Sequence, residues 1–172
     1  VEAFDPVKVI KPGQKALLAD GRILLIAKET LASSVKCTVI NGGTLRSKSG
    51  ISVPESTLDL PCLTEKDKVD LLWAIENNAD YIALSFVGSA KDIEDARKFM
   101  ETKGANIPII SKIERAGSLD DISAIVEASD AVMVARGDLG LELPLERVPA
   151  AQRFIIAEAN LTGTPVIQLR KC

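Results

Sequence analysis

The chain has 172 residues, of which 47% are hydrophobic and 26% charged, a balance typical of globular rather than disordered proteins. A formal net charge of −3 offers no basic field for nucleic acid, and no apolar run approaches the roughly 20 residues that a membrane helix needs. The chain contains no histidine, which excludes Ser-His-Asp triads, Cys-His dyads and histidine-based zinc sites. A bound metal must therefore be held by oxygen, which favours Mg²⁺.

The three cysteines, Cys37, Cys62 and Cys172, are far apart and form no CxxC pair, as in proteins of a reducing compartment. Residues 1–14 show no signal-peptide pattern. We therefore expect a cytoplasmic protein. The first residue, Val1, is typical of a processed chain or of a piece cut from a longer one.

The first part of the chain, residues 1–54, is predicted to be rich in β-strands. Residues 15–29 are typical of two short strands around an Asp20-Gly21 turn, which is a hairpin signal. Residues 33–43 predict a third strand that ends at a pair of glycines. Short strands, tight turns and few aromatic residues indicate a small barrel or sandwich, with only a marginal core of its own.

The second part, residues 55–172, alternates short apolar strands with amphipathic helices. Continuous apolar runs are typical of parallel strands buried on both faces. The predicted strands are residues 81–87, 107–114, 131–138 and 165–169, and the predicted helices are residues 64–78, 89–104, 119–129 and 145–163. This β-α series predicts the α/β class, with about four βα units of a partial (β/α)₈ TIM barrel beside the small β-rich segment.

Two kinds of signal mark the ends and faces of these helices. Thr64 is expected to cap the first helix, and Gly104 and Gly163 are expected to end two later ones. The helical period predicts one apolar, buried side for the first helix. That side is expected to contain Val69, Leu72, Trp73 and Ile75.

Lys112 and Glu114 form the first candidate site. Side chains alternate along a strand, so both residues share a face with Ile110. In βα folds the carboxyl ends of the strands form the reaction site. One interpretation is an ordinary ion pair at a strand end. The other is a metal-binding carboxylate beside a lysine that handles a negatively charged substrate.

Asp138 is the second candidate, because it ends the next predicted strand. Adjacent strands lie about 5 Å apart, so Glu114 and Asp138 could hold one cation between them. Gly137 and Gly140 would let a ligand approach the backbone closely, and successive amides there could form an anion cradle. The alternative is a glycine-containing turn in which Asp138 caps the following helix.

Two further features carry weaker signals. The loop NGGTLRSKS, residues 41–49, presents Arg46 and Lys48 among glycines, and a solvated basic turn is the simpler interpretation. Ser85 lies at the end of the strand YIALSF, where a buried serine bonded to the backbone would explain it equally well.

Five segments together resemble the pyruvate kinase family along nearly the whole chain. They are NGGTLRSKSGISVP, LPCLTEKDKVDLLWAIENNADYIALSFV, IPIISKIERAG, SDAVMVARGDLGLELPLERVPAAQ and TGTPVIQ. The combination of ISKIE and MVARGDLG is specific to that family. The resemblance implies that residues 1–54 are the latter part of a mobile β lid domain. It implies that residues 55–172 are strands four to seven of the catalytic (β/α)₈ barrel.

The resemblance also implies functions for particular residues. Lys112 resembles the lysine that stabilises the transferring phosphoryl group and the enolate, and Glu114 and Asp138 resemble the ligands of Mg²⁺ or Mn²⁺. Lys48 resembles a lid lysine that reaches the nucleotide phosphates. The edge of the pocket for the substrate carboxylate corresponds to the backbone of Ala135, Arg136 and Gly137. Ser85 falls in the family's strand-four SF motif.

The same resemblance implies the reaction and the partners. Family members transfer the phosphoryl group of phosphoenolpyruvate to ADP, giving pyruvate and ATP, and they assemble as homotetramers. They also use K⁺, whose ligands we expect to be absent from this chain. We expect the isolated segment to be inactive.

The sequence departs from the family pattern at four positions. Gly88 stands where an arginine is usual, and Ser49 replaces a second basic residue of the lid. Ser52 replaces an asparagine, and Arg170 replaces a threonine that lines the substrate pocket. A natural, truncated, non-catalytic module for binding or assembly therefore remains an alternative. A different Mg²⁺-dependent enzyme of the phosphoenolpyruvate barrel group is disfavoured by the ISKIE and ARGDLG pair.

Overall fold

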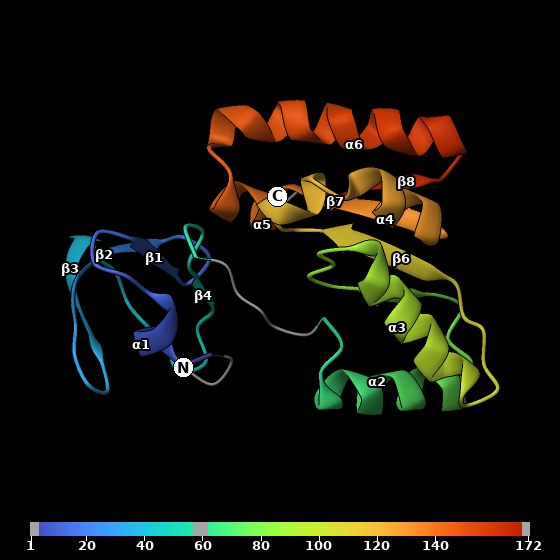
Figure 1. Ribbon diagram of the computed structural model, residues 1–172, viewed down its shortest axis with the longest axis horizontal. Coiled ribbons are helices and arrows are strands. Elements are labelled where there is room, and N and C mark those ends of the chain that lie inside the picture. The colour runs from blue at the N-terminus through green and yellow to red at the C-terminus, as the bar shows by residue number, and fades with distance from the viewer. Residues whose placement is uncertain (1–3, 57–61, 170–172) are drawn as a thin grey trace. The chain divides into compact units, whose positions relative to one another are not determined.

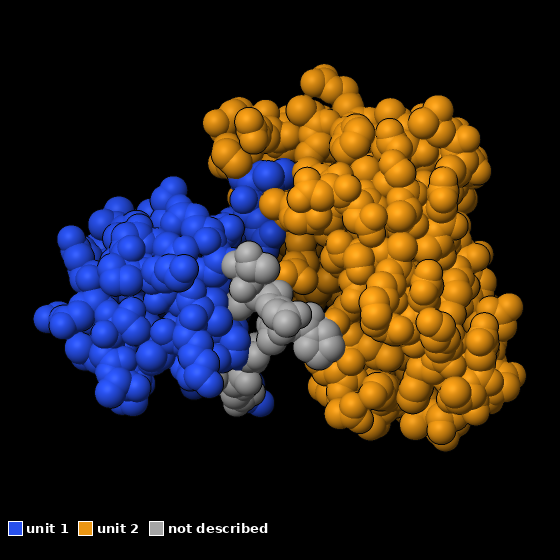
Figure 2. Space-filling view, in the orientation of Figure 1, with its two compact units in different colours: residues 1–60, 141–143 blue, residues 61–140, 144–172 orange. Residues whose placement is uncertain are grey.

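The structure is a computed structural model that describes residues 4–56 and 62–169. It divides the chain into two compact units (Figure 2), one of residues 1–60 with 141–143 and one of residues 61–140 with 144–172. The domain boundary expected between residues 54 and 55 stays a prediction. None of the described helices combines the length and the apolar character needed to cross a membrane.

The first unit is built on an antiparallel sheet with the strand order β3-β2-β1-β4. Asp20 and Gly21 have φ angles of 56° and 77°, and the amide of Arg22 donates to the carbonyl of Ala19, so the predicted hairpin turn is confirmed. A small core of Ile10, Ala16, Ala27 and Val53 lies beneath the sheet. The elements are α1 (Pro6–Val9), β1 (Lys15–Leu18), β2 (Ile23–Thr30), β3 (Val35–Asn41) and β4 (Ile51–Ser52).

The second unit is built on a parallel sheet with the strand order β5-β6-β7-β8, and a helix lies between each pair of successive strands (Figure 1). This arrangement confirms the predicted α/β class. The strands are β5 (Ile82–Leu84), β6 (Ile109–Ile113), β7 (Ala131–Ala135) and β8 (Val166–Leu169). The helices are α2 (Glu65–Glu76), α3 (Ala90–Glu101), α4 (Ile122–Ala128), α5 (Arg136–Glu142) and α6 (Val148–Thr162), with 3₁₀ turns η1 (Ala116–Leu119) and η2 (Leu145–Arg147).

One face of the parallel sheet packs against the helices and forms the main core. Alternate strand residues point to that face, as the period of two requires. Fully buried members of this core are Ile109, Ile113, Val132 and Val134 from the strands and Ile93, Ile125 and Ile155 from the helices. On the other face, Ile167 and Leu169 of β8 are 38% and 44% exposed. Lys112 belongs to this second face, because it alternates with Ile113 along β6.

The predicted apolar side of α2 was wrong for Val69 and Trp73. Leu71 is the buried residue of this helix and Ile75 packs beside it, whereas Val69 and Trp73 are 63% and 65% exposed. Successive helical residues turn by about 100°, so Leu71 and Ile75 share one face and Val69 and Trp73 share the opposite one. The predicted cap is confirmed, because Thr64 forms a capping box at the start of α2.

The glycines expected to end helices do so. Gly104 and Gly163 have φ angles of 70° and 73°, in the left-handed region that glycine adopts without steric cost. Gly163 caps α6, and its amide bonds to the last turn of that helix. Both helices therefore stop where the chain must turn toward the next strand.

Candidate functional site

A polar cluster lies at the carboxyl ends of β5 and β6. The Nζ atom of Lys112 lies 2.5 Å from Oε1 of Glu114 and donates to Oγ of Ser85 over 2.9 Å. The backbone amide of Phe86 donates to Oε2 of Glu114 over 3.0 Å. The Glu114 side chain is 3% exposed and the Lys112 side chain 23% exposed. A nearly buried carboxylate is thus paired with a lysine that still reaches solvent.

Strand register explains why these residues meet. β5 and β6 run parallel with Leu84 opposite Ser111, so Ser85 follows β5 at the level of Lys112. The next residue, Phe86, has a φ angle of 57°, which is uncommon for a residue with a side chain. This strained backbone directs its amide at Glu114, and strain of this kind is typical of functional sites.

The cluster leaves bonding capacity for a ligand. An ammonium group has three donor hydrogens, and Lys112 uses two of them on Ser85 and Glu114. A carboxylate has about four acceptor positions, and Glu114 uses one for Lys112 and one for Phe86. Lys112 can therefore donate one further hydrogen bond to a bound anion, and Glu114 can offer carboxylate oxygens to a cation.

The end of β7 differs from the prediction. The strand stops at Ala135, and α5 begins directly at Arg136, so Gly137 and Asp138 lie in the first turn of a helix. The predicted strand through Asp138 was wrong. Acidic residues are favourable in the first turn, where helical amides lack partners, which favours helix over strand here.

β7 still carries Asp138 to the neighbourhood of β6. The two strands are parallel neighbours with Val134 opposite Ile113, so the segments that follow them leave the same edge of the sheet. The Asp138 side chain is exposed. Nowhere in the described residues do three or more Asp, Glu or Cys side chains form a metal-binding group. The sharing of one cation by Glu114 and Asp138 stays a prediction.

Gly140 has a packing explanation. A Cβ atom at this position would lie 3.2 Å from Cδ2 of Leu145, closer than ordinary contact. A glycine therefore lets α5 lie against the residues that follow it, and no ligand is needed to explain it.

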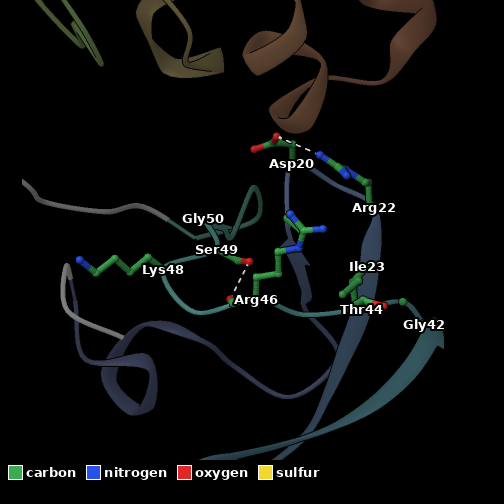
Figure 3. A pocket seen from close by; sticks show the side chains of 11 residues that line it. Asp20, Arg22, Ile23, Gly42, Thr44, Arg46, Lys48, Ser49 and Gly50 are labelled. Atoms are coloured by element: carbon green, nitrogen blue, oxygen red, sulfur yellow. Dashed lines mark hydrogen bonds and ion pairs between the residues drawn. The ribbon is translucent and has the colours of Figure 1, made fainter.

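A hollow of about 490 Å³ lies in the first unit and is lined by the loop that carries Arg46 and Lys48 (Figure 3). Lys48 has a φ angle of 61°. Figure 3 shows its side chain extending away from Arg46, whose guanidinium points toward the β1–β2 turn. Residues 41–48 are all exposed, so the basic loop borders a solvent-open hollow and the interpretation as a solvated turn stands.

The model of the pyruvate kinase barrel domain matches residues 2–171. The chain belongs to the pyruvate kinase family. It is 43% identical over 164 residues to a pyruvate kinase of Clostridium acetobutylicum, covering 95% of this chain and 35% of that protein. It is 40% identical over 167 residues to a pyruvate kinase of Thermococcus litoralis, covering 97% of this chain and 35% of that protein.

A pyruvate kinase of Agrobacterium vitis is 44% identical over 160 residues, with 93% of this chain and 33% of that protein covered. The chain thus spans about a third of the length of the curated pyruvate kinases that it matches. These matches show the family, and they indicate that the parallel sheet is part of the pyruvate kinase barrel domain.

Gly88, where the resemblance led us to expect an arginine, lies beside Arg115. A Cβ atom at Gly88 would be 3.5 Å from Nη1 of Arg115 and 3.5 Å from Oδ2 of Asp92. The amide of Gly88 donates to the same Asp92 oxygen over 2.8 Å. A guanidinium therefore occupies the space next to this position although the local residue has no side chain. Of the other departures, Arg170 lies outside the described residues.

Sequence reasoning gave too little weight to two groups in the second unit. Ser85 was the weaker candidate, yet its hydroxyl accepts from Lys112. The Phe86 amide was not considered, and its unusual φ angle leaves no mark in the sequence. The SF motif was the only available signal for either group.

Cys62 packs against the same segment. Its thiol donates to the carbonyl of Ser85, with 3.1 Å between Sγ and oxygen. Burial, together with the nearby carboxylates of Asp92 and Asp67, raises the pKa of the Cys62 thiol to about 12. The thiolate, which is the reactive form, is therefore strongly disfavoured at neutral pH.

We expect Cys62 to resist alkylation by iodoacetamide at about pH 8, where an ordinary thiol is partly ionised. Peptide mass spectrometry on the folded chain should find the peptide containing Cys62 largely unmodified. The same chain in denaturant provides the control and should react fully. Equal rates of modification in the folded and denatured chains would contradict the raised pKa of this partly buried thiol.

Proposed function

We propose that this chain is the part of a pyruvate kinase that contributes to phosphoryl transfer from phosphoenolpyruvate to ADP in glycolysis. The observation that carries the proposal is the cluster of Lys112, Glu114, Ser85 and the Phe86 amide at the carboxyl ends of β5 and β6. Phosphoryl transfer depends mainly on positioning and on neutralisation of charge, so a site without histidine is adequate for it.

Lys112 is proposed to neutralise charge on the substrate. Its ammonium group is fixed by Ser85 and Glu114, so little reorganisation is required when negative charge develops nearby. The remaining N–H can donate to the transferring phosphoryl group and then to the enolate oxygen of the product. The backbone of Ala135, Arg136 and Gly137 is proposed to border the pocket for the substrate carboxylate.

Glu114 and Asp138 are proposed to hold Mg²⁺ or Mn²⁺. Both offer carboxylate oxygens, which hard divalent cations prefer, and Mg²⁺ is commonly held by one or two carboxylates together with substrate oxygens. When bound, the ion would supply positive charge that neutralises the charge of the substrate oxygens. Glu114 fits this function because each of its oxygens keeps acceptor capacity beyond its present partner.

The remaining assignments concern the whole protein. Lys48 of the first unit is proposed to reach the phosphates of ADP. K⁺ as a second cofactor, a homotetrameric assembly and a cytoplasmic location are proposed for the parent enzyme from the family alone.

Mn²⁺ titration followed by paramagnetic water relaxation tests the metal assignment. We expect weak binding by the chain alone and tighter binding after addition of oxalate, because ligand and metal share one coordination shell. Glu114→Gln and Asp138→Asn should each abolish the effect of oxalate. The matched control is Glu127→Gln, which removes an exposed carboxylate of α4 and should leave the titration unchanged. Equal weak binding in all four proteins, unaffected by oxalate, would refute the assignment.

We also expect the isolated chain to show no appreciable turnover. A transition state is stabilised only by a complete set of positioned groups, and this chain spans about a third of its relatives. A coupled assay with phosphoenolpyruvate, ADP, Mg²⁺ and K⁺ provides the measurement. Turnover of about 10 s⁻¹, ordinary for an enzyme, would show that the described groups suffice.

A further inference from the structure

Ser118 is a fully buried serine for which the proposed reaction has no use. It lies in η1, the 3₁₀ turn that follows β6, and both Ser118 and Val87 are 0% exposed. The hydroxyl of Ser118 donates to the carbonyl of Val87 over 2.5 Å, although the two residues are 31 positions apart in the chain. A buried carbonyl without a partner costs free energy, so this bond fixes the direction in which the Val87 carbonyl points.

The residue before Val87 is bonded by the same stretch of chain. The amide of Phe86 donates to Oε2 of Glu114 over 3.0 Å, and Glu114 ends β6 just before the turn that contains Ser118. The segment that leaves β6 therefore bonds two successive residues of the loop after β5, the first at its amide and the second at its carbonyl. These two bonds together restrict the backbone conformation of Phe86.

Other side chains hold the two ends of this loop. The thiol of Cys62 donates to the carbonyl of Ser85, with 3.1 Å between Sγ and oxygen. One carboxylate oxygen of Asp92 accepts from the amides of the two residues that follow Val87, over 2.8 Å and 2.9 Å. A thiol is a weak donor, and Asp92 acts beyond the Val87 carbonyl. Of these anchors, Ser118 is therefore the one best placed to hold the middle of the loop.

The middle of the loop needs such an anchor because Phe86 has an unfavourable backbone conformation. Its φ angle of 57° lies in the left-handed region, where a residue with a Cβ atom is less stable than glycine. Packing of the ring does not offset this cost, since Phe86 is 61% exposed. If its φ angle relaxed to a negative value, the peptides on either side would turn, and the amide would leave Glu114.

We propose that Ser118 is a positioning residue for Glu114. Its bond to Val87 holds Phe86 at a positive φ angle, and the Phe86 amide in turn orients the Glu114 carboxylate. A carboxylate held in one orientation needs less reorganisation when it binds a cation. The use of Glu114 as a metal ligand rests on the proposed function, whereas its orientation by the loop does not.

Amide hydrogen exchange of the full chain, followed by NMR without metal, tests this proposal. Ser118→Ala removes the donor and leaves the buried carbonyl of Val87 without its partner. We expect exchange at the amide of position 86 to become about tenfold faster or more. The amide of Val132 in β7, which donates to the carbonyl of Pro165 over 2.9 Å, reports on the sheet itself and should change much less.

A second substitution separates positioning from ordinary stabilisation. Glycine adopts a positive φ angle without steric cost, so Phe86→Gly added to Ser118→Ala should restore slow exchange at position 86, after correction for intrinsic rates. Phe86→Ala removes the same exposed ring but keeps a Cβ atom, so it should not restore slow exchange. The matched control is Ser123→Ala, which removes an exposed hydroxyl of α4 and should leave position 86 unchanged.

The Mn²⁺ and oxalate titration provides a second readout. Ser118→Ala should weaken the oxalate-dependent binding about tenfold, as loss of a group that orients a metal ligand does, and Phe86→Gly should restore it. A titration unchanged by Ser118→Ala would overturn the proposal. So would equal acceleration of exchange at position 86 and at Val132, or equal rescue by the two substitutions of Phe86.

Failure of the proposed function would give a different result. An unaltered chain that binds no Mn²⁺ would refute the metal assignment, but the exchange measurements contain no metal and would still decide whether Ser118 orients Glu114.

Discussion

Replacing Glu114 by alanine is expected to destabilise the second unit by about 3 kcal/mol, the lower part of the range for breaking a buried ion pair. The substitution removes the carboxylate that pairs with Lys112 and accepts from the Phe86 amide. The Lys112 side chain, which is 23% exposed, would lose its counter-charge, and the strained Phe86 amide would lose its acceptor. Far-UV circular dichroism during urea unfolding reports on this unit, because it contains every described helix except the four-residue α1 and part of α5.

Two other variants separate the causes of this loss. Glu114→Gln keeps an acceptor for the Phe86 amide and removes only the charge, so a smaller loss is expected. Glu94→Ala breaks a pair with Lys98 at 3.8 Å in which both side chains are mostly exposed, and its cost should stay below about 1 kcal/mol. A Glu114→Ala variant as stable as Glu94→Ala would show that the cluster does not hold the ends of β5 and β6 together.

Replacing Ile155 by alanine is expected to cost about 3 kcal/mol, within the range for large-to-small changes in a core. Ile155 of α6 is fully buried in the cluster that covers the parallel sheet. Its neighbour Phe154 is 44% exposed and gives a control on the same helix turn. Phe154→Ala removes more atoms but should cost less, because those atoms are only partly buried. Urea unfolding of both variants provides the comparison, and the opposite ranking would contradict the packing of α6.

The regular parts of the second unit were predictable because their signals are local. Continuous apolar runs predicted β6 and β7, and the glycines at 104 and 163 predicted where two helices end. The buried side of α2 was not predictable in the same way. Its apolar residues occupy both faces, and only tertiary packing selects Leu71 over Trp73.

The candidate site was partly predictable for the same reason. The alternation of a strand places Lys112 and Glu114 on one face, so their pairing follows from the sequence. Their other partners come from the end of β5 and depend on strand register, which a single sequence does not specify. Asp138 was assigned to a strand because the apolar run precedes it, but α5 begins at Arg136, directly after Ala135, the last apolar residue of that run.

The basic loop of the first unit shows a further limit. Composition alone did not distinguish Arg46 from Lys48 as a possible ligand-binding residue. The resemblance to the family assigned that function to Lys48. The fold distinguishes them, because the closed loop directs Arg46 into the hollow and Lys48 along a different path (Figure 3). Side-chain direction on an irregular loop depends on φ angles such as that of Lys48, which the sequence does not reveal.

Glu114 and Asp138 are proposed to hold one divalent cation where the chain leaves the carboxyl ends of β6 and β7. A crystal structure of the chain with Mn²⁺ and oxalate, with anomalous diffraction to locate the metal, tests it most directly. We expect one Mn²⁺ within about 2–2.5 Å of an oxygen from each carboxylate, with oxalate completing its coordination. Carboxylates too far apart to share the ion, or Mn²⁺ bound elsewhere with Glu114 still paired only to Lys112, would contradict it.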